Sequence, residues 1–135
     1  MHVLIVEDNP TNQHIMLKML SPLADCRTAG DGQEGVQAFE EALAQKKPYD
    51  LVCLDIMMPE MDGHEALREI RRLERENQIP PERSAKIIMT TAVQSQSSIE
   101  KARQSGCDGY LVKPIRKITL YEELERLGLI PGGGL

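Results

Sequence analysis

Short apolar runs alternate with helix-like segments along this chain, and that alternation limits the possible fold more than any other feature. The expected strands are residues 2–6, 26–29, 50–54, 86–90 and 109–112. Each is followed by a segment whose apolar residues recur at helical spacing. Five such repeats predict an α/β fold, with a doubly wound five-stranded parallel sheet covered by helices on both faces. The crossovers between strands should be right-handed.

Residues that cap helices mark where the expected helices begin. Asn9 precedes Pro10, which fits the first position of a helix because proline has no N–H to satisfy there. Other candidate starts are Asp31, Asp62, Ser97 with Glu100, and Thr119 with Glu122. The last two pairs have the spacing of a capping box. We therefore expect the final helix to begin near Thr119.

The composition suits one domain and argues against several kinds of function. The chain has 135 residues, 41% of them hydrophobic and 27% charged, with a formal net charge of −5. A chain of this length can bury a hydrophobic core of its own. A negative net charge disfavours a nucleic-acid surface, which needs a basic patch. No apolar run has the length of a membrane span, and the first residues lack the pattern of a signal peptide.

Neither the cysteines nor the histidines have the spacing of metal ligands. Cys26, Cys53 and Cys107 are scattered and odd in number, which predicts reduced thiols in a cytoplasmic protein. The histidines are His2, His14 and His64. We expect surface or capping roles for them.

Acidic residues follow two of the expected strands. Asp55 closes the apolar run 51–54, and Glu7 with Asp8 closes the run 3–6. The carboxyl ends of parallel strands meet at one edge of a sheet, where binding sites of such sheets lie. If the two strands are neighbours, three carboxylates converge there, and their mutual repulsion requires a hard cation. Thr91 and Lys113 follow two further strands and fall on the same edge.

Four motifs in order resemble the receiver domain of two-component response regulators, of which the chemotaxis regulators are typical. They are residues 3–12, 54–63, 90–92 and 110–114. The resemblance runs from Val3 to about Leu127. It implies a flavodoxin-like sheet with the strand order 2-1-3-4-5. On this basis residues 1–128 form the receiver domain, and residues 129–135 form a flexible tail or linker.

The resemblance implies that Asp55 is the phosphoacceptor of a magnesium-dependent reaction. A carboxylate can attack a phosphoryl group and hold it as an acyl phosphate. Mg²⁺, or Mn²⁺ in its place, would be bound by Glu7, Asp8, Asp55 and the backbone carbonyl of Met57, since oxygen ligands suit it. Glu7 stands where an aspartate is commoner in the family, and its longer side chain would reach the metal through water.

Lys113, Thr91 and Tyr110 complete the implied site. Lys113 supplies a fixed positive charge, and the peptide bond between Lys113 and Pro114 is expected to be cis. Thr91 donates to a phosphoryl oxygen and, with Tyr110, acts as the switch. The surface built from the helix after residue 97, the strand 109–112 and the last helix then changes shape.

The implied partners are proteins. A sensor histidine kinase or a phosphotransfer protein would supply the phosphoryl group, and a downstream protein target would recognise the switched surface. A phosphorylation-dependent homodimer is a further possibility, and neither nucleic acid nor membrane is an expected partner. The protein would not be an enzyme acting on a separate substrate. It would catalyse its own phosphorylation and dephosphorylation.

Each residue also has a structural interpretation, and two other functions remain open. Glu7 and Asp8 could cap a helix, and Asp55 could begin a turn. Thr91 could be an ordinary strand-end threonine, Lys113 a surface lysine, and Tyr110 a half-buried tyrosine at a strand edge. A pseudo-receiver acting by protein contacts alone is one alternative function. A magnesium-dependent aspartate phosphatase is the other, although such enzymes carry a second aspartate where this chain has Met57.

Overall fold

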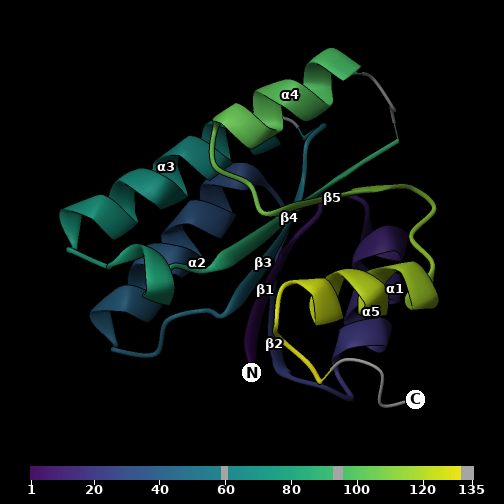
Figure 1. Cartoon of the computed structure of the whole chain (residues 1–135), viewed down its shortest axis with the longest axis horizontal. Helices are drawn as coiled ribbons and strands as arrows, with labels where there is room; N and C mark the ends of the chain where they lie inside the picture. The colour runs from purple at the N-terminus through teal and green to yellow at the C-terminus, as the bar shows by residue number, and fades with distance from the viewer. Residues whose placement is uncertain (59–60, 93–95, 132–135) are drawn as a thin grey trace.

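The computed structural model describes residues 1–58, 61–92 and 96–131, and these residues fold as the alternation predicts (Figure 1). The strands are β1 His2–Val6, β2 Asp25–Ala29, β3 Leu51–Asp55, β4 Lys86–Thr91 and β5 Gly109–Val112. The helices are α1 Pro10–Leu20, α2 Gly32–Ala44, α3 Gly63–Glu76, α4 Gln96–Gln104 and α5 Lys117–Arg126. A short 3-10 helix, η1, covers Pro81–Arg83 before β4.

The five strands form one parallel sheet in the order β2-β1-β3-β4-β5, which confirms the predicted fold class. The strand order reverses between β1 and β3, which are neighbours in the sheet but not in the chain. Val6 of β1 pairs with Leu54 of β3, so the two strands end at the same level. The acidic residues that follow Val6 and Leu54 are therefore placed side by side.

Helices cover both faces of the sheet, with α1 and α5 on one side and α2, α3 and α4 on the other (Figure 1). Alternate residues of β3 enter two separate cores because successive strand side chains point to opposite faces. Val52 and Leu54 pack into the core beneath α2 and α3, whereas Leu51 and Cys53 pack into the core beneath α1 and α5. All four residues are buried, as expected for a strand covered on both sides.

Three of the predicted helix caps form, and two predicted helix starts are wrong. Helix α4 begins at Gln96, one residue before the expected capping residue Ser97. The side chains of Asn9, Asp31 and Asp62 accept hydrogen bonds from backbone N–H groups three residues further on, at 2.8–3.0 Å. The last helix begins at Lys117, two residues before the expected Thr119. The N–H of Leu120 donates to the carbonyl of Arg116 at 3.0 Å, so helical bonding starts before the capping-box pair and without a side-chain cap.

A nearly buried arginine ties α3 to the strands on one side of the sheet. Arg71 donates to Glu74 at 2.6 Å, to Asp108 at 2.8 Å, and to the carbonyls of Gly106 and Ala85 at 2.8–3.0 Å. Its neighbour Arg72 pairs instead with exposed glutamates of the same helix. The run of glutamates and arginines from Glu65 to Glu76 predicts a solvated helix face with local ion pairs. That prediction holds for Arg72, but it is wrong for Arg71 and Glu74, which join α3 to β4 and to the start of β5.

The end of the domain extends a little beyond α5. Leu129 and Ile130, assigned to the expected tail, are half-buried against the core beneath α1 and α5. Residues 132–135 of that tail lie outside the part of the chain that the structure describes. The limit of the domain at residue 128 stays a prediction. Over the described ranges, we find no helix long and apolar enough to span a membrane.

The Arg71 contacts predict a large difference between two adjacent arginines. Arg71→Ala leaves two poorly exposed carboxylates without their counter-charge, so we expect the free energy of unfolding to fall by about 3 kcal/mol. Arg72→Ala removes only exposed ion pairs and should cost less than about 1 kcal/mol. Urea unfolding of both variants at pH 7 measures the difference. Equal losses in the two variants would contradict the structural role assigned to Arg71.

Candidate functional site

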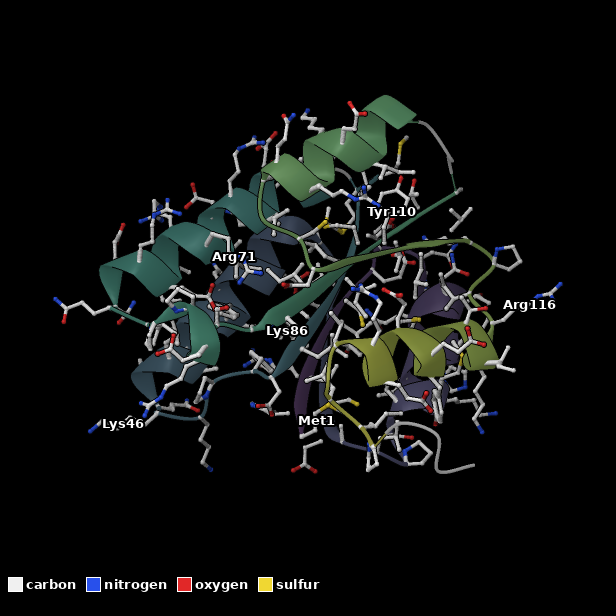
Figure 2. The ribbon with its side chains drawn as sticks, viewed as in Figure 1. Met1, Lys46, Arg71, Lys86, Tyr110 and Arg116 are labelled. Carbon is white, nitrogen blue, oxygen red and sulfur yellow. The ribbon has the colours of Figure 1, made fainter. Side chains whose placement is uncertain are left out.

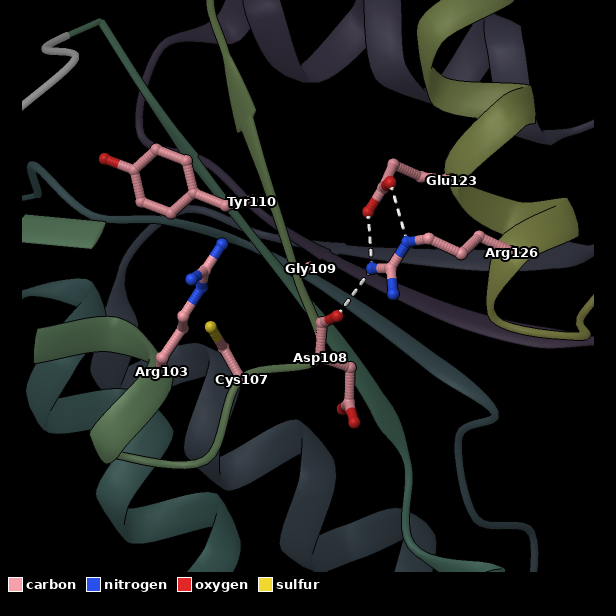
Figure 3. A pocket seen from close by; sticks show the side chains of 7 residues that line it. All are labelled: Arg103, Cys107, Asp108, Gly109, Tyr110, Glu123 and Arg126. Atoms are coloured by element: carbon pink, nitrogen blue, oxygen red, sulfur yellow. Dashed lines mark hydrogen bonds and ion pairs between the residues drawn. The ribbon is translucent and has the colours of Figure 1, made fainter. Parts of the chain in front are cut away.

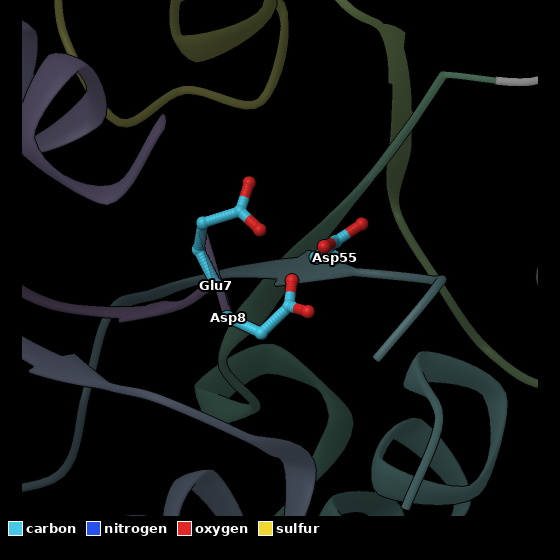
Figure 4. A group of neighbouring side chains, drawn as sticks. All are labelled: Glu7, Asp8 and Asp55. Atoms are coloured by element: carbon cyan, nitrogen blue, oxygen red, sulfur yellow. The ribbon is translucent and has the colours of Figure 1, made fainter. Parts of the chain in front are cut away.

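Three carboxylates meet at the carboxyl edge of the sheet, beside the point where the strand order reverses. Asp55 is the last residue of β3, and Glu7 and Asp8 directly follow β1. One oxygen from each of the three lies within 4.8 Å of the others (Figure 4). The structure therefore brings together the three acidic residues that the sequence singles out.

Lys113 supplies the positive charge at this cluster. Its Nζ lies 2.6 Å from Oε1 of Glu7 and 3.4 Å from Oδ2 of Asp55. Its backbone N–H donates to the carbonyl of Thr91 at 2.7 Å, which fixes the chain directly after β5. The bond from Lys113 to Pro114 is cis, as the resemblance implies. The sequence placed Lys113 at this edge, but the short contact with Glu7 appears only in the structure.

Burial and mutual repulsion shape the ionisation of the cluster. Asp55 and Glu7 are only 3% and 4% exposed, whereas Asp8 is open to solvent. Burial, together with the hydrogen bond and the charge of Glu7, raises the pKa of Asp55 to about 7. Burial alone would raise the pKa of Glu7, but its bonds with Asp55 and Lys113 lower it overall. One lysine therefore does not balance three carboxylates in this space.

The donor set fits a hard divalent cation. Three carboxylates offer the oxygen ligands that Mg²⁺ prefers, and the exposed position of Asp8 leaves room for the waters that this ion keeps. A divalent charge would also offset the repulsion that raises the pKa of Asp55. Met57 lies beside the cluster, with its N–H donating to Oδ1 of Asp55 at 3.3 Å. Its carbonyl as a metal ligand stays a prediction.

Close packing holds the start of α3 against the end of β3. The N–H of Gly63 donates to the carbonyl of Ile56 at 2.9 Å. A Cβ atom on Gly63 would lie 2.4 Å from the carbonyl oxygen of Asp55, which is closer than any side chain can approach. A glycine is needed here because α3 begins directly against the backbone of the phosphoacceptor candidate.

The expected surface or capping role of His64 is wrong, because His64 is only 6% exposed.

Thr91 and Tyr110 lie on adjacent strands and face the same side of the sheet. Thr91 is the last residue of β4 and is 1% exposed. Met89, two residues earlier, belongs to the core beneath α2 and α3, and Tyr110 packs against that core from β5. Strand alternation therefore directs Thr91 and Tyr110 toward the helices α3 and α4. Thr90 faces the other way and lines a small cavity with Glu7 and Lys113, a role that the sequence analysis missed.

A second hollow lies over β5, away from the carboxylates. It has a volume of about 550 Å³ and lies between α4 and α5 (Figure 3). Tyr110 and Arg103 line one side of it, and Arg126 lines the other. Arg126 bonds to Glu123 and to the carbonyl of Asp108 at 2.7–2.9 Å. We call this hollow the β5 cleft. It belongs to the surface that the sequence predicts to change shape.

Comparison with known proteins gives one family. The family model of the response regulator receiver domain matches residues 3–125. A probable histidine kinase 2 of Oryza sativa is 37% identical over 132 residues, and the signal transduction histidine-protein kinase BarA of Shigella flexneri is 35% identical over 135. These alignments cover 90% and 100% of this chain. The chain spans only 12% and 13% of the two kinases.

Solved structures show the same fold. The receiver domain of the sensor histidine kinase PA1611 from Pseudomonas aeruginosa has a TM-score of 0.74 and 34% identity, covering 93% of this chain and 94% of that one. It holds a magnesium ion in its active-site cleft. The receiver domain of the histidine kinase CKI1 from Arabidopsis thaliana, complexed with Mg²⁺ and BeF₃⁻, has a TM-score of 0.80 and 27% identity. That alignment covers 93% of this chain and 89% of the CKI1 chain.

The raised pKa of Asp55 predicts how stability depends on pH without metal. Its pKa in the folded state, about 7, exceeds the ordinary 3.8, so Asp55 favours folding below about pH 4 and that contribution is lost as pH rises to about 7. Asp55→Asn does not titrate. We therefore expect the variant to be more stable than the wild type by about 2 kcal/mol at pH 8.

Urea unfolding in EDTA from pH 4 to pH 9 measures this dependence. The advantage of Asp55→Asn should grow between about pH 4 and pH 7 and then level off. Parallel stability profiles for the two proteins would show that the pKa of Asp55 is not raised in the folded state.

Proposed function

The chain belongs to the response regulator receiver domain family, and from that premise we propose that Asp55 accepts a phosphoryl group in a phosphorelay. The observation that carries the proposal is the meeting of Glu7, Asp8 and Asp55 within 4.8 Å at one sheet edge, with Lys113 beside them. Independent structural roles for these residues would not require them to share one site.

The transfer uses Asp55 as the nucleophile. An oxygen of its carboxylate bonds to phosphorus while the bond from phosphorus to the nitrogen of a donor phosphohistidine breaks, and the imidazole leaves. The product is an acyl phosphate on Asp55. Little covalent chemistry is needed beyond this, so most of the catalysis is positioning and charge stabilisation by the residues around Asp55.

Mg²⁺ would be held by Glu7, Asp8, Asp55 and the backbone carbonyl of Met57. When bound, it would offset the repulsion among the carboxylates and stabilise the charge that develops on the phosphoryl oxygens. Support comes from the three-carboxylate donor set. Further support comes from the PA1611 receiver domain, which holds a magnesium ion in its active-site cleft.

Lys113 exchanges partners during the reaction. In this structure its ammonium group lies closer to Glu7 than to Asp55. Burial by itself lowers the pKa of Lys113, but the hydrogen bond to Glu7 and the charge of Asp55 raise it, so the group stays cationic. We propose that Lys113 moves from Glu7 toward a phosphoryl oxygen, which releases Glu7 for the metal.

Thr91 and Tyr110 connect the phosphoryl group to the outer surface. The hydroxyl of Thr91 would donate to a phosphoryl oxygen, and the Tyr110 ring would turn inward into the space that Thr91 leaves. Their position on one face of adjacent strands supports this coupling. Tyr110 also lines the β5 cleft, so its movement would reshape the surface of α4, β5 and α5 for a downstream target.

We also propose the partners and the setting of this domain. A histidine kinase or a phosphotransfer protein is the expected donor, supported by the histidine kinases among its relatives. A phosphorylation-dependent homodimer would use the surface of α4, β5 and α5. The receiver would end near residue 128, with a tail or linker after it. The number and spacing of its cysteines, three and scattered, favour a location in the cytoplasm.

The two alternative functions have less support. A pseudo-receiver would have no use for a complete set of three carboxylates and a lysine at one edge. An aspartate phosphatase would place an acid two residues after Asp55. The chain has Met57 there, with 66% of its surface exposed.

The first experiment is intact mass after incubation with acetyl phosphate and Mg²⁺. We expect a metal-dependent gain of one phosphoryl group that hydroxylamine removes, because hydroxylamine cleaves acyl phosphates. Asp55→Ala is the control and should gain nothing. No adduct on the wild type, together with no response of Tyr110 or α4 to BeF₃⁻ and Mg²⁺, would favour the pseudo-receiver.

Met57 offers a test of how long the phosphoryl group persists. Its apolar side chain cannot position an attacking water, so the acyl phosphate should not be unusually short-lived. Met57→Asn places an amide at the same exposed position, where one added hydrogen bond to water should shorten the half-life by about two- to tenfold. Decay of the phosphorylated protein, followed by mass spectrometry, measures this. An unchanged half-life would show that residue 57 does not control access of water.

A further inference from the structure

The outer face of α5 carries a stripe of residues that neither the proposed site nor the β5 cleft uses. The α5 stripe consists of Lys117, Ile118, Tyr121, Glu122 and Glu125, and together they line a shallow groove of about 420 Å³. Ile118 is 68% exposed, which is the largest exposure among the large apolar residues described. From α5, the β5 cleft is lined by Glu123 and Arg126 instead. The α5 stripe is therefore a separate surface.

The charges of the α5 stripe run against the helix dipole. A cation near the start of a helix and anions in its second half are each disfavoured by the partial charges of the helix ends. Lys117 nevertheless begins α5, and Glu122 and Glu125 lie in its second half. In the part of the chain described, none of these three forms an ion pair, although Glu123 and Arg126 beside them do. Ion pairs within the described part of the chain therefore do not account for this order.

The middle of the α5 stripe is apolar and held in place. The hydroxyl of Tyr121 donates to the carbonyl of Met19 in α1 at 2.9 Å. The ammonium group of Lys117 lies 5.4 Å from the centre of the Tyr121 ring. The ring is thus fixed before any partner arrives, which reduces the entropy lost on binding. Along the helix, the stripe reads basic, then apolar, then acidic.

We propose that the α5 stripe binds the α5 stripe of a second copy of this chain, with the two helices antiparallel about a two-fold axis. Such an interface is self-complementary, because each contact occurs twice. Lys117 then lies opposite Glu125 of the second copy, and Glu125 opposite its Lys117. Tyr121, midway between residues 117 and 125, lies near the axis. Ile118 is covered by the apolar middle of the other helix.

The size of the surface predicts a weak, reversible dimer. α5 has 10 residues and so is about 15 Å long. One helix face of this length buries less area than a standard protein interface. We therefore expect a dissociation constant between about 1 μM and about 1 mM. Each chain carries a net charge of −5, which opposes association. At about 0.15 M salt the Debye length of about 8 Å screens that repulsion, while adjacent charges still interact.

Sedimentation equilibrium of the full chain, without phosphodonor and in EDTA, tests the pairing through charge reversal. Lys117→Glu and Glu125→Lys should each raise the dissociation constant by about tenfold or more, because each replaces two attractions by two repulsions. The double variant, Lys117→Glu with Glu125→Lys, should return to within about threefold of the wild type. Both reversals follow the preference of the helix dipole, so α5 stays folded, which circular dichroism verifies.

Lys46→Glu is the matched control. It changes the net charge as Lys117→Glu does, but Lys46 lies at the far side of the molecule from the start of α5, marked by Arg116 (Figure 2). It should leave the dissociation constant within about twofold, since distant exposed charges are screened. A chain that stays monomeric up to about 1 mM would overturn the proposal. So would a dimer that the single α5 reversals leave unchanged, or that the double variant does not restore.

This proposal is independent of the proposed function. No phosphoryl group or metal takes part, so Asp55→Ala should dimerise like the wild type. Loss of the dimer with intact phosphorylation would count against the α5 pairing alone. Loss of phosphorylation with an intact dimer would count against the role of Asp55 alone.

Discussion

The parallel pairing of β1 with β3 is the constraint on which the site depends. Val6 and Leu54 are register partners, so Glu7, Asp8 and Asp55 must end at the same edge of the sheet. Both strands are buried on both faces, which prevents either from shifting to separate the acids. The hydrophobic core therefore holds three carboxylates together against their mutual repulsion. Because these carboxylates repel one another, the site favours added positive charge. Lys113 supplies only part of that charge.

Contacts at both ends of β5 connect the site to the opposite side of the sheet. Arg71 ties α3 to the beginning of β5 through Asp108 and the carbonyl of Gly106. The opposite end of β5 leads directly to Lys113, whose backbone bonds to Thr91. One end of β5 is thus fixed by an ion-pair network and the other ends in the site. Under the proposed function, a change at Lys113 or Thr91 would therefore be expressed between these two ends, around Tyr110 and the β5 cleft.

Helix α5 takes part in two surfaces with different chemistry. Glu123 and Arg126 pair with each other beside the β5 cleft, so that side of the helix is internally neutralised. The α5 stripe instead carries separated charges around an apolar centre. If the stripe pairs with a second copy, the β5 cleft stays open in the dimer. Self-association and recognition of a downstream target could then occur together, because they would not compete for the same residues.

The sequence by itself determined the fold class, the positions of the strands to within one residue and the identity of the acidic cluster. Apolar runs that alternate with capped helices leave few ways to bury both, and parallel strands bring their carboxyl ends to one edge. Only the tertiary structure decided the burial of His64, the Arg71 network and the earlier start of α5. It also decided the contact of Lys113 with Glu7. These features depend on packing between segments far apart in the chain. Local pattern cannot distinguish an arginine that faces solvent from one that a neighbouring loop encloses.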